Sequence, residues 1–182
     1  MYKRQNDACA IVATQVSGHE TISDPASLEA QIFASALSSL SDDLAEMLAR
    51  DGEGATKFVR VICEDATSDE DARAIANTVA LSPLVKTALA ASDPNWGRIV
   101  AAVGRAPVSK IAIDRVNVWI NDVQVVENGG RHSEYTEEAG QAAMNPVDID
   151  IRISMGVGSG HCRVMTCDLT KEYVRINAEY RT

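Results

Sequence analysis

Apolar residues recur at helical spacing through the first third of the chain. They follow Asp24-Pro25, a pair that can cap and begin a helix, and they stop at Asp51-Gly52. The apolar stripe of this predicted helix consists of Leu28, Ile32, Phe33, Ala36, Leu37, Leu40, Leu44, Met47 and Leu48. Because amphipathic helices usually bury such a face, we expect the stripe to belong to the core.

Shorter apolar runs then predict strands interleaved with helices. Residues 8–13 and 58–63 have the composition of buried strands. Further helices are expected to begin at Ser68, which acidic residues follow, at Ser82-Pro83, where Leu84 should face inward, and at Asp93-Pro94. The last of these helices should end at Gly104.

Beyond Pro107 the apolar pattern changes to alternation. Residues 115–126 predict a hairpin that turns at Asn121-Asp122, and residues 147–155 predict a half-exposed strand. The glycine-rich residues 156–160 should form a hairpin turn into a returning strand, and residues 168–177 a short helix or turn. Helices and strands without a regular βαβ repeat indicate an α+β fold, with helices packed on mixed or antiparallel sheets.

Composition narrows the possible partners and compartment. The 182 residues carry a formal net charge of −9, which disfavours nucleic acid and anionic membranes as the main partner. The sequence contains neither an apolar run of membrane-spanning length nor a secretory signal, so we expect a cytoplasmic protein. The four cysteines, Cys9, Cys63, Cys162 and Cys167, form no C-x-x-C pair, which predicts reduced, mostly buried thiols and no zinc site.

The stretch Asp-Gly-Glu-Gly-Ala-Thr-Lys, residues 51–57, is the clearest candidate for chemistry. Two glycines flank Glu53 and allow the backbone to turn tightly, which would present one carboxylate between a helix and a strand, beside Thr56 and Lys57. A glycine helix stop followed by a polar connection explains the same pattern. The pattern alone leaves both interpretations open.

The chain does not contain the residues of a self-contained active site. Nucleophile-elbow, zinc-protease and Walker motifs are absent from the sequence. His19, His132 and His161 have no partner at motif spacing and are interpreted as surface or packing residues, and Glu134, Glu137 and Glu138 as a solvated face.

Four blocks in one order resemble a known family. They are DGEGATK, then SPLVKTA from Ser82, then DPNWGRI from Asp93, and finally TCDLT with the tail YVRINAEYRT, which ends at Thr182. Together they resemble the β subunit of bifunctional ornithine acetyltransferase, also called glutamate N-acetyltransferase, from about Asn6 to Thr182. The first five residues do not match, so we expect the natural chain to extend upstream of a false start or truncation.

The resemblance implies an autoprocessed-threonine enzyme of arginine biosynthesis. In that family a threonine freed by self-cleavage takes the acetyl group of N-acetylornithine and passes it to glutamate through an acyl-enzyme. The α subunit supplies oxyanion-hole groups and assembles with β as α2β2. The threonine should lie upstream of Asn6, so no catalytic residue is expected in this chain, which alone should be inactive. No cofactor or metal is implied, although acetyl-CoA is a possible donor substrate.

The resemblance also implies which residues bind substrate. Glu53, Asn177 and Thr182 match the family positions that line the substrate pocket. Lys86, Asn95, Trp96 and Arg98 belong to the other blocks and are interpreted as packing or subunit contacts. Residues 1–57 would be a fragment of the nucleophile-bearing layered domain, and residues 58–182 a C-terminal α+β domain.

Two other functions remain open at this point. A truncated paralogue without the nucleophile would be a non-catalytic binding or interaction module. An amide or peptide hydrolase could use the same autoprocessed fold, but DGEGATK and the terminal block resemble the acetyltransferase branch.

Overall fold

The computed structural model describes residues 21–179. The chain divides into two units between Asp51 and Gly52. In the first unit, α1 (Leu28–Arg50) begins after Ser27, whose side chain accepts a hydrogen bond from the amide of Ala30. None of the helices between residues 21 and 179 combines the length and the apolar character that crossing a bilayer requires.

Two predictions about α1 are wrong. Asp24 accepts a hydrogen bond from the amide of Ala26 at 2.8 Å and so closes a turn ahead of the helix instead of capping it. The apolar stripe is not core, because no residue of α1 is buried, and Ile32 and Leu40 are 60% and 56% exposed. An amphipathic pattern specifies that a face needs covering, but it does not specify which chain covers it.

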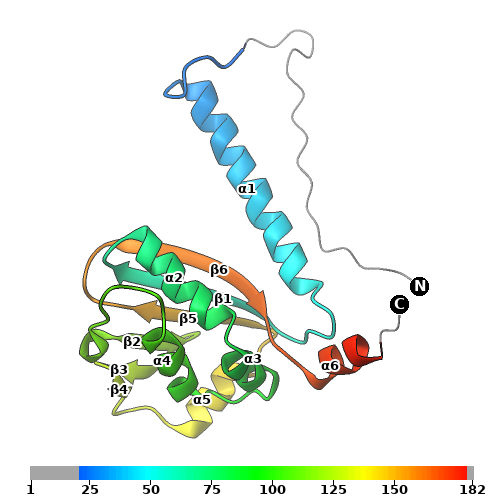
Figure 1. Cartoon of the computed structure of the whole chain (residues 1–182), viewed down its shortest axis with the longest axis vertical. Helices are drawn as coiled ribbons and strands as arrows, with labels where there is room; N and C mark the ends of the chain where they lie inside the picture. Colours follow the sequence, from blue (N-terminus) through cyan, green and yellow to red (C-terminus); the bar gives the residue numbers. More distant parts are fainter. Residues whose placement is uncertain (1–20, 180–182) are drawn as a thin grey trace. The chain divides into compact units, whose positions relative to one another are not determined.

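The second unit is built on one six-stranded sheet. Its elements are β1 (Phe58–Ala66), α2 (Asp69–Ala80), α3 (Pro83–Ala90), α4 (Trp96–Gly104), a 3₁₀ turn (Ile113–Arg115), β2 (Asn117–Ile120), β3 (Val123–Glu127), β4 (Gly130–Arg131), α5 (Glu137–Met144), β5 (Asp148–Ser154), β6 (Gly160–Cys167) and α6 (Lys171–Ala178). The strand order is β4-β3-β2-β5-β1-β6, with β1 parallel to β5 and antiparallel to β6 (Figure 1). The mixed sheet confirms the α+β prediction.

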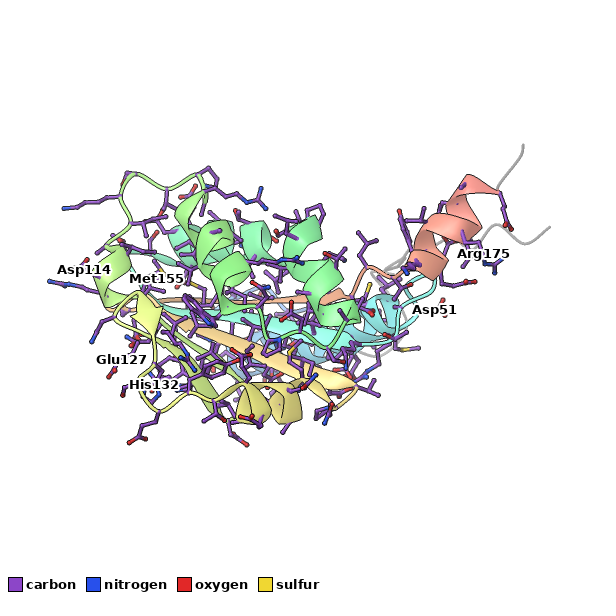
Figure 2. The ribbon with its side chains drawn as sticks, turned by 90° about the horizontal axis from the view of Figure 1, so that it is seen from below. Asp51, Asp114, Glu127, His132, Met155 and Arg175 are labelled. Atoms are coloured by element: carbon purple, nitrogen blue, oxygen red, sulfur yellow. The ribbon has the colours of Figure 1, made fainter. Side chains whose placement is uncertain are left out.

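Helices α2, α3 and α4 lie along one face of this sheet (Figure 2). The core forms there, between the inward side chains of the central strands and those of the helices. It includes Val59, Val61, Cys63, Ile75, Val79, Leu89, Val103, Ile149, Ile151 and Ile153. Alternation along β5 places its isoleucines in this core and its polar residues on the opposite face.

The opposite face carries charged and aromatic side chains. Arg60 pairs with Asp150 at 2.6 Å, and Arg152 pairs with Glu64 at 3.2 Å. The guanidinium of Arg152 also lies 4.1 Å from the centroid of the Trp119 ring. The prediction that β1 is buried on both faces is therefore only half right, because Arg60 and Glu64 are half-exposed.

The predicted hairpin between β5 and β6 is wrong. The two strands do run in opposite directions, but β1 lies between them and pairs with both. The connection after Met155 therefore crosses the end of β1, where the amide of Val157 donates to the carbonyl of Asp65 at 2.9 Å. The local sequence predicted the turn, but it could not specify that the strand after the turn, β6, pairs with β1.

The starts of α2 and α3 follow the sequence prediction, whereas the start of α4 does not. Ser68 caps α2 and Pro83 opens α3, both as predicted. The cap of α4 is Asn95, since Asp93 instead accepts a hydrogen bond from the Asn95 side chain at 3.0 Å. Leu84 does not face inward: it is 61% exposed, while its neighbour Val85 is buried.

Candidate functional site

Residues 52–57, which we call the Glu53 loop, connect to β1 through a tight turn. The amide of Ala55 donates to the carbonyl of Gly52 at 3.0 Å, which closes a four-residue turn with Glu53 and Gly54 at its centre. Gly54 has a φ of +68°, a backbone conformation that strongly favours glycine. The turn predicted from the two glycines is confirmed.

Gly54 is also the point where the loop touches the end of the chain. A Cβ atom built on Gly54 would lie 2.8 Å from the amide nitrogen of Tyr173 and 3.0 Å from the Cβ atom of Glu172. The hydroxyl of Thr170 donates to the carbonyl of Gly54 at 2.7 Å and also caps α6 by accepting from the amide of Tyr173. We call residues 168–177, which make these contacts, the terminal segment.

The contact with α6 brings two of the expected substrate-binding residues together. The side-chain amide of Asn177 donates to Oε2 of Glu53 at 3.0 Å and to the carbonyl of Tyr173 at 2.9 Å. Asn177 is exposed and Glu53 is half-exposed, so a ligand can reach both. Thr182, the third expected residue, lies outside the described residues.

Lys57 does not belong to the exposed part of the loop. Its ammonium donates to the carbonyls of Met144 at 2.7 Å and Pro146 at 3.0 Å, and the residue is only 9% exposed. It therefore anchors the start of β1 to the connection between α5 and β5. The expectation that Lys57 lies beside the Glu53 carboxylate is wrong for its side chain, which is bound to these carbonyls instead.

Asp168 joins the end of β6 to the Glu53 loop, a role that its sequence context does not predict. Its carboxylate accepts from the amide of Thr56 at 2.8 Å, from the hydroxyl of Thr56 at 2.6 Å and from the amide of Lys57 at 3.1 Å. Asp168 is 3% exposed, so this buried anion is satisfied entirely by the loop that carries Glu53. The available signal was a lone carboxylate directly after the predicted returning strand, in the block TCDLT.

The residues interpreted as packing contacts do hold the helices in place. The ammonium of Lys86 donates to Thr166 of β6 at 3.0 Å, and Arg98 of α4 donates to the carbonyl of Leu84 in α3 at 2.9 Å. Asn95 caps α4, and Trp96 packs against the core. These contacts join residues of the second unit that lie outside the Glu53 loop.

The cysteines and histidines add no second site within residues 21–179. Cys63 and Cys162 are free, buried and opposite one another on β1 and β6, and burial raises the pKa of Cys63 to about 12. Such a thiol is protonated and unreactive at neutral pH. His132 and His161 are half-exposed and exposed, and Cys9 and His19 lie outside the described part of the chain. Within that part, no group of three or more metal-binding side chains converges.

The comparisons with known proteins agree with the resemblance carried by the four blocks. The chain is 51% identical over 177 residues to the arginine biosynthesis bifunctional protein ArgJ of Methylococcus capsulatus, and 45% identical to that of Neisseria meningitidis serogroup A. Each match covers 97% of this chain but only 43–44% of the relative. The chain thus spans less than half the length of these curated relatives.

A solved structure shares the fold. The crystal structure of the arginine biosynthesis bifunctional protein argJ from Bacillus halodurans superposes with a TM-score of 0.84 and 34% sequence identity. The match covers 89% of this chain and 75% of the Bacillus halodurans chain. The sequence model of the ArgJ family matches residues 4–182. The chain therefore belongs to the ArgJ family.

Proposed function

We propose that this chain provides the β-subunit part of an ornithine acetyltransferase. The complete enzyme would move an acetyl group from N-acetylornithine, or from acetyl-CoA, to glutamate in the cytoplasm. A threonine outside residues 1–182 would attack the acetyl carbonyl, the amide C–N bond would break, and ornithine would leave with a proton. The amine of glutamate would then attack the resulting ester and free the threonine.

The observation that carries this proposal is the hydrogen bond between Glu53 and Asn177. The two residues come from opposite ends of the described second unit, 124 positions apart, and both match substrate-binding positions of the family. Both N–H groups of the Asn177 amide are used, one by Glu53 and one by the carbonyl of Tyr173. Among the described residues, this leaves Oε1 of Glu53 and Oδ1 of Asn177 as acceptors for a ligand.

A pair that offers only acceptors favours a cationic ligand group. N-acetylornithine carries an ammonium on its side chain, which donates three hydrogen bonds and complements the charge of Glu53. Its carboxylate has no donor to meet at this pair. We therefore assign Glu53 and Asn177 to the ornithine ammonium, with Thr182 completing the pocket.

The partner would be the α subunit, in an α2β2 assembly. The apolar stripe of α1 supports this proposal, because an uncovered face of that length is expected to pack against another chain or segment. Residues 1–57 would then add to the layered domain that contains the nucleophile. The chain alone is expected to be inactive, since neither the threonine nor the oxyanion hole would be present.

The test is acetyl transfer by the complete protein, with and without Glu53. We expect Glu53→Gln to lower kcat/KM for N-acetylornithine roughly 10- to 100-fold, the loss expected for one charged hydrogen bond. Glu127→Gln is the matched control, since Glu127 is exposed at the opposite end of the unit from α6 and Arg175 (Figure 2). Equal kcat/KM for Glu53→Gln and the unsubstituted protein would contradict the assignment, and binding without transfer would favour a non-catalytic paralogue.

A further inference from the structure

Asp168 occupies a position from which it can control Glu53 without reaching a ligand. It follows β6 directly and lies opposite Lys57, to whose carbonyl its own amide donates at 3.3 Å. Its two carboxylate oxygens accept three hydrogen bonds, all from Thr56 and Lys57. Because Asp168 is almost completely buried, it can affect a substrate only through the residues around it, which are those of the loop and of the terminal segment.

These contacts fix the loop on the β1 side of Glu53. Thr56 is held through both its amide and its hydroxyl, and Gly54 is held through its carbonyl by Thr170. Glu53 thus extends from a backbone that is tied to the terminal segment at several successive points. The terminal segment also supplies Asn177, so one stretch of chain sets both the backbone and the carboxylate of Glu53.

We propose that Asp168 is a positioning residue for Glu53, an inference that rests on the proposed function. Its carboxylate accepts hydrogen bonds from the amides of Thr56 and Lys57 and so sets the direction in which the turn presents Glu53. A displacement of about 1 Å in such a group can change a rate about 100-fold. Losing Asp168 should therefore weaken the use of N-acetylornithine through Glu53.

Two substitutions separate position from charge. Asp168→Asn keeps one oxygen as acceptor for the two amides, and its NH2 group can donate to the hydroxyl oxygen of Thr56. The Thr56 hydroxyl then accepts this hydrogen bond instead of donating it. Asp168→Ala leaves all three donors without an acceptor. We expect kcat/KM for N-acetylornithine to fall roughly 10- to 100-fold in Asp168→Ala, mainly through KM, and to stay within about threefold in Asp168→Asn.

The decisive experiment is a double-mutant cycle in the complete protein. If Asp168 acts through Glu53, then Asp168→Ala should lower kcat/KM by less than about threefold once Glu53 is already Gln. A general structural effect would lower kcat/KM equally in both backgrounds, and this result would overturn the proposal. Thr56→Val, which removes one of the three donors, provides the same cycle if Asp168→Ala yields too little folded protein.

The outcomes also separate this inference from the proposed function. Transfer by the unsubstituted protein, together with equal losses in both backgrounds, would overturn only the role of Asp168. Absence of transfer by the unsubstituted protein would overturn the proposed function, and the positioning role with it.

Discussion

Gly54 determines whether Glu53 and α6 can lie together. Its φ of +68° gives the turn its direction, and the absence of a side chain lets the backbone of Tyr173 approach. Either requirement alone would favour glycine, and here both fall on the residue next to the candidate ligand contact. Substitution of Gly54 by any residue with a side chain is therefore expected to disturb the loop.

Gly54→Ala is expected to lower the free energy of unfolding by about 1–3 kcal/mol, the cost of a non-glycine residue in a left-handed conformation. The new methyl group would also push α6 away and lengthen the bond between Glu53 and Asn177. Denaturant unfolding of the chain measures the loss.

Gly104→Ala is the matched control, because Gly104 ends α4 and a Cβ atom there would have no atom within 4 Å. Alanine favours helix over glycine by up to about 1 kcal/mol, so this variant should be as stable as the original or more so. Equal losses at both positions would contradict the role given to Gly54.

The position of α6 depends on the side chain of Thr170. Thr170 accepts from the amide of Tyr173 at the start of the helix and donates to the carbonyl of Gly54. The helix has no buried residue, so its attachment rests on such polar contacts and not on an apolar face. The position of Asn177 depends in turn on the position of the helix.

Thr170→Ala should destabilise the chain more than Thr136→Ala does. Thr136 caps α5 in the same way, through the amide of Ala139, and each cap is worth about 1 kcal/mol. The Thr170→Ala variant also loses the hydrogen bond to the carbonyl of Gly54, which is worth about another 1 kcal/mol. The difference between the two free energies of unfolding is the test, and a difference of zero would mean that the Gly54 contact is dispensable.

Local signals predicted most elements, while contacts distant in sequence were not predictable. The cap at Ser68, the helix start at Pro83 and the turn at Asn121, whose φ is +49°, depend on a few neighbouring residues. The placement of β1 between β5 and β6 depends on strands that occur much later in the chain. A period-2 pattern specifies a face but not a neighbour, so β5 and β6 were wrongly expected to pair.

The candidate site shows the same division. Glu53 and its turn could be predicted from two glycines, and the pairing with Asn177 only in the sense that a family resemblance named both residues. The bond from Asp168 to Thr56 joins residues 112 positions apart, and no spacing rule connects them. Such a contact becomes visible only when the ends of β1 and β6 are placed side by side.

At the scale of the whole molecule, the exposed stripe of α1 predicts an association. Leu40→Glu places a charge in the middle of the stripe and should reduce the amount of the proposed α subunit that copurifies with this chain by at least about tenfold, because burying an unpaired charge is costly. Ser38→Glu is the control, since two residues correspond to about 200° around a helix and place it on the opposite side. Copurification that is equally strong with both variants would contradict the assignment of the stripe to the interface.

The central position of β1 has a consequence for the order in which the sheet assembles during synthesis. Phe58 is opposite Asp148 on one side and Cys167 on the other, so β1 leaves the ribosome long before either neighbour exists. Until then both of its edges are open, and an apolar strand with open edges is prone to pair with other chains. The sheet can close only after β6 has been made, and Asp168, Thr170 and Asn177 follow β6 directly in the sequence. The candidate site is thus completed only after the last strand of the sheet has been made, and a nascent chain that stops before Asp168 never forms it.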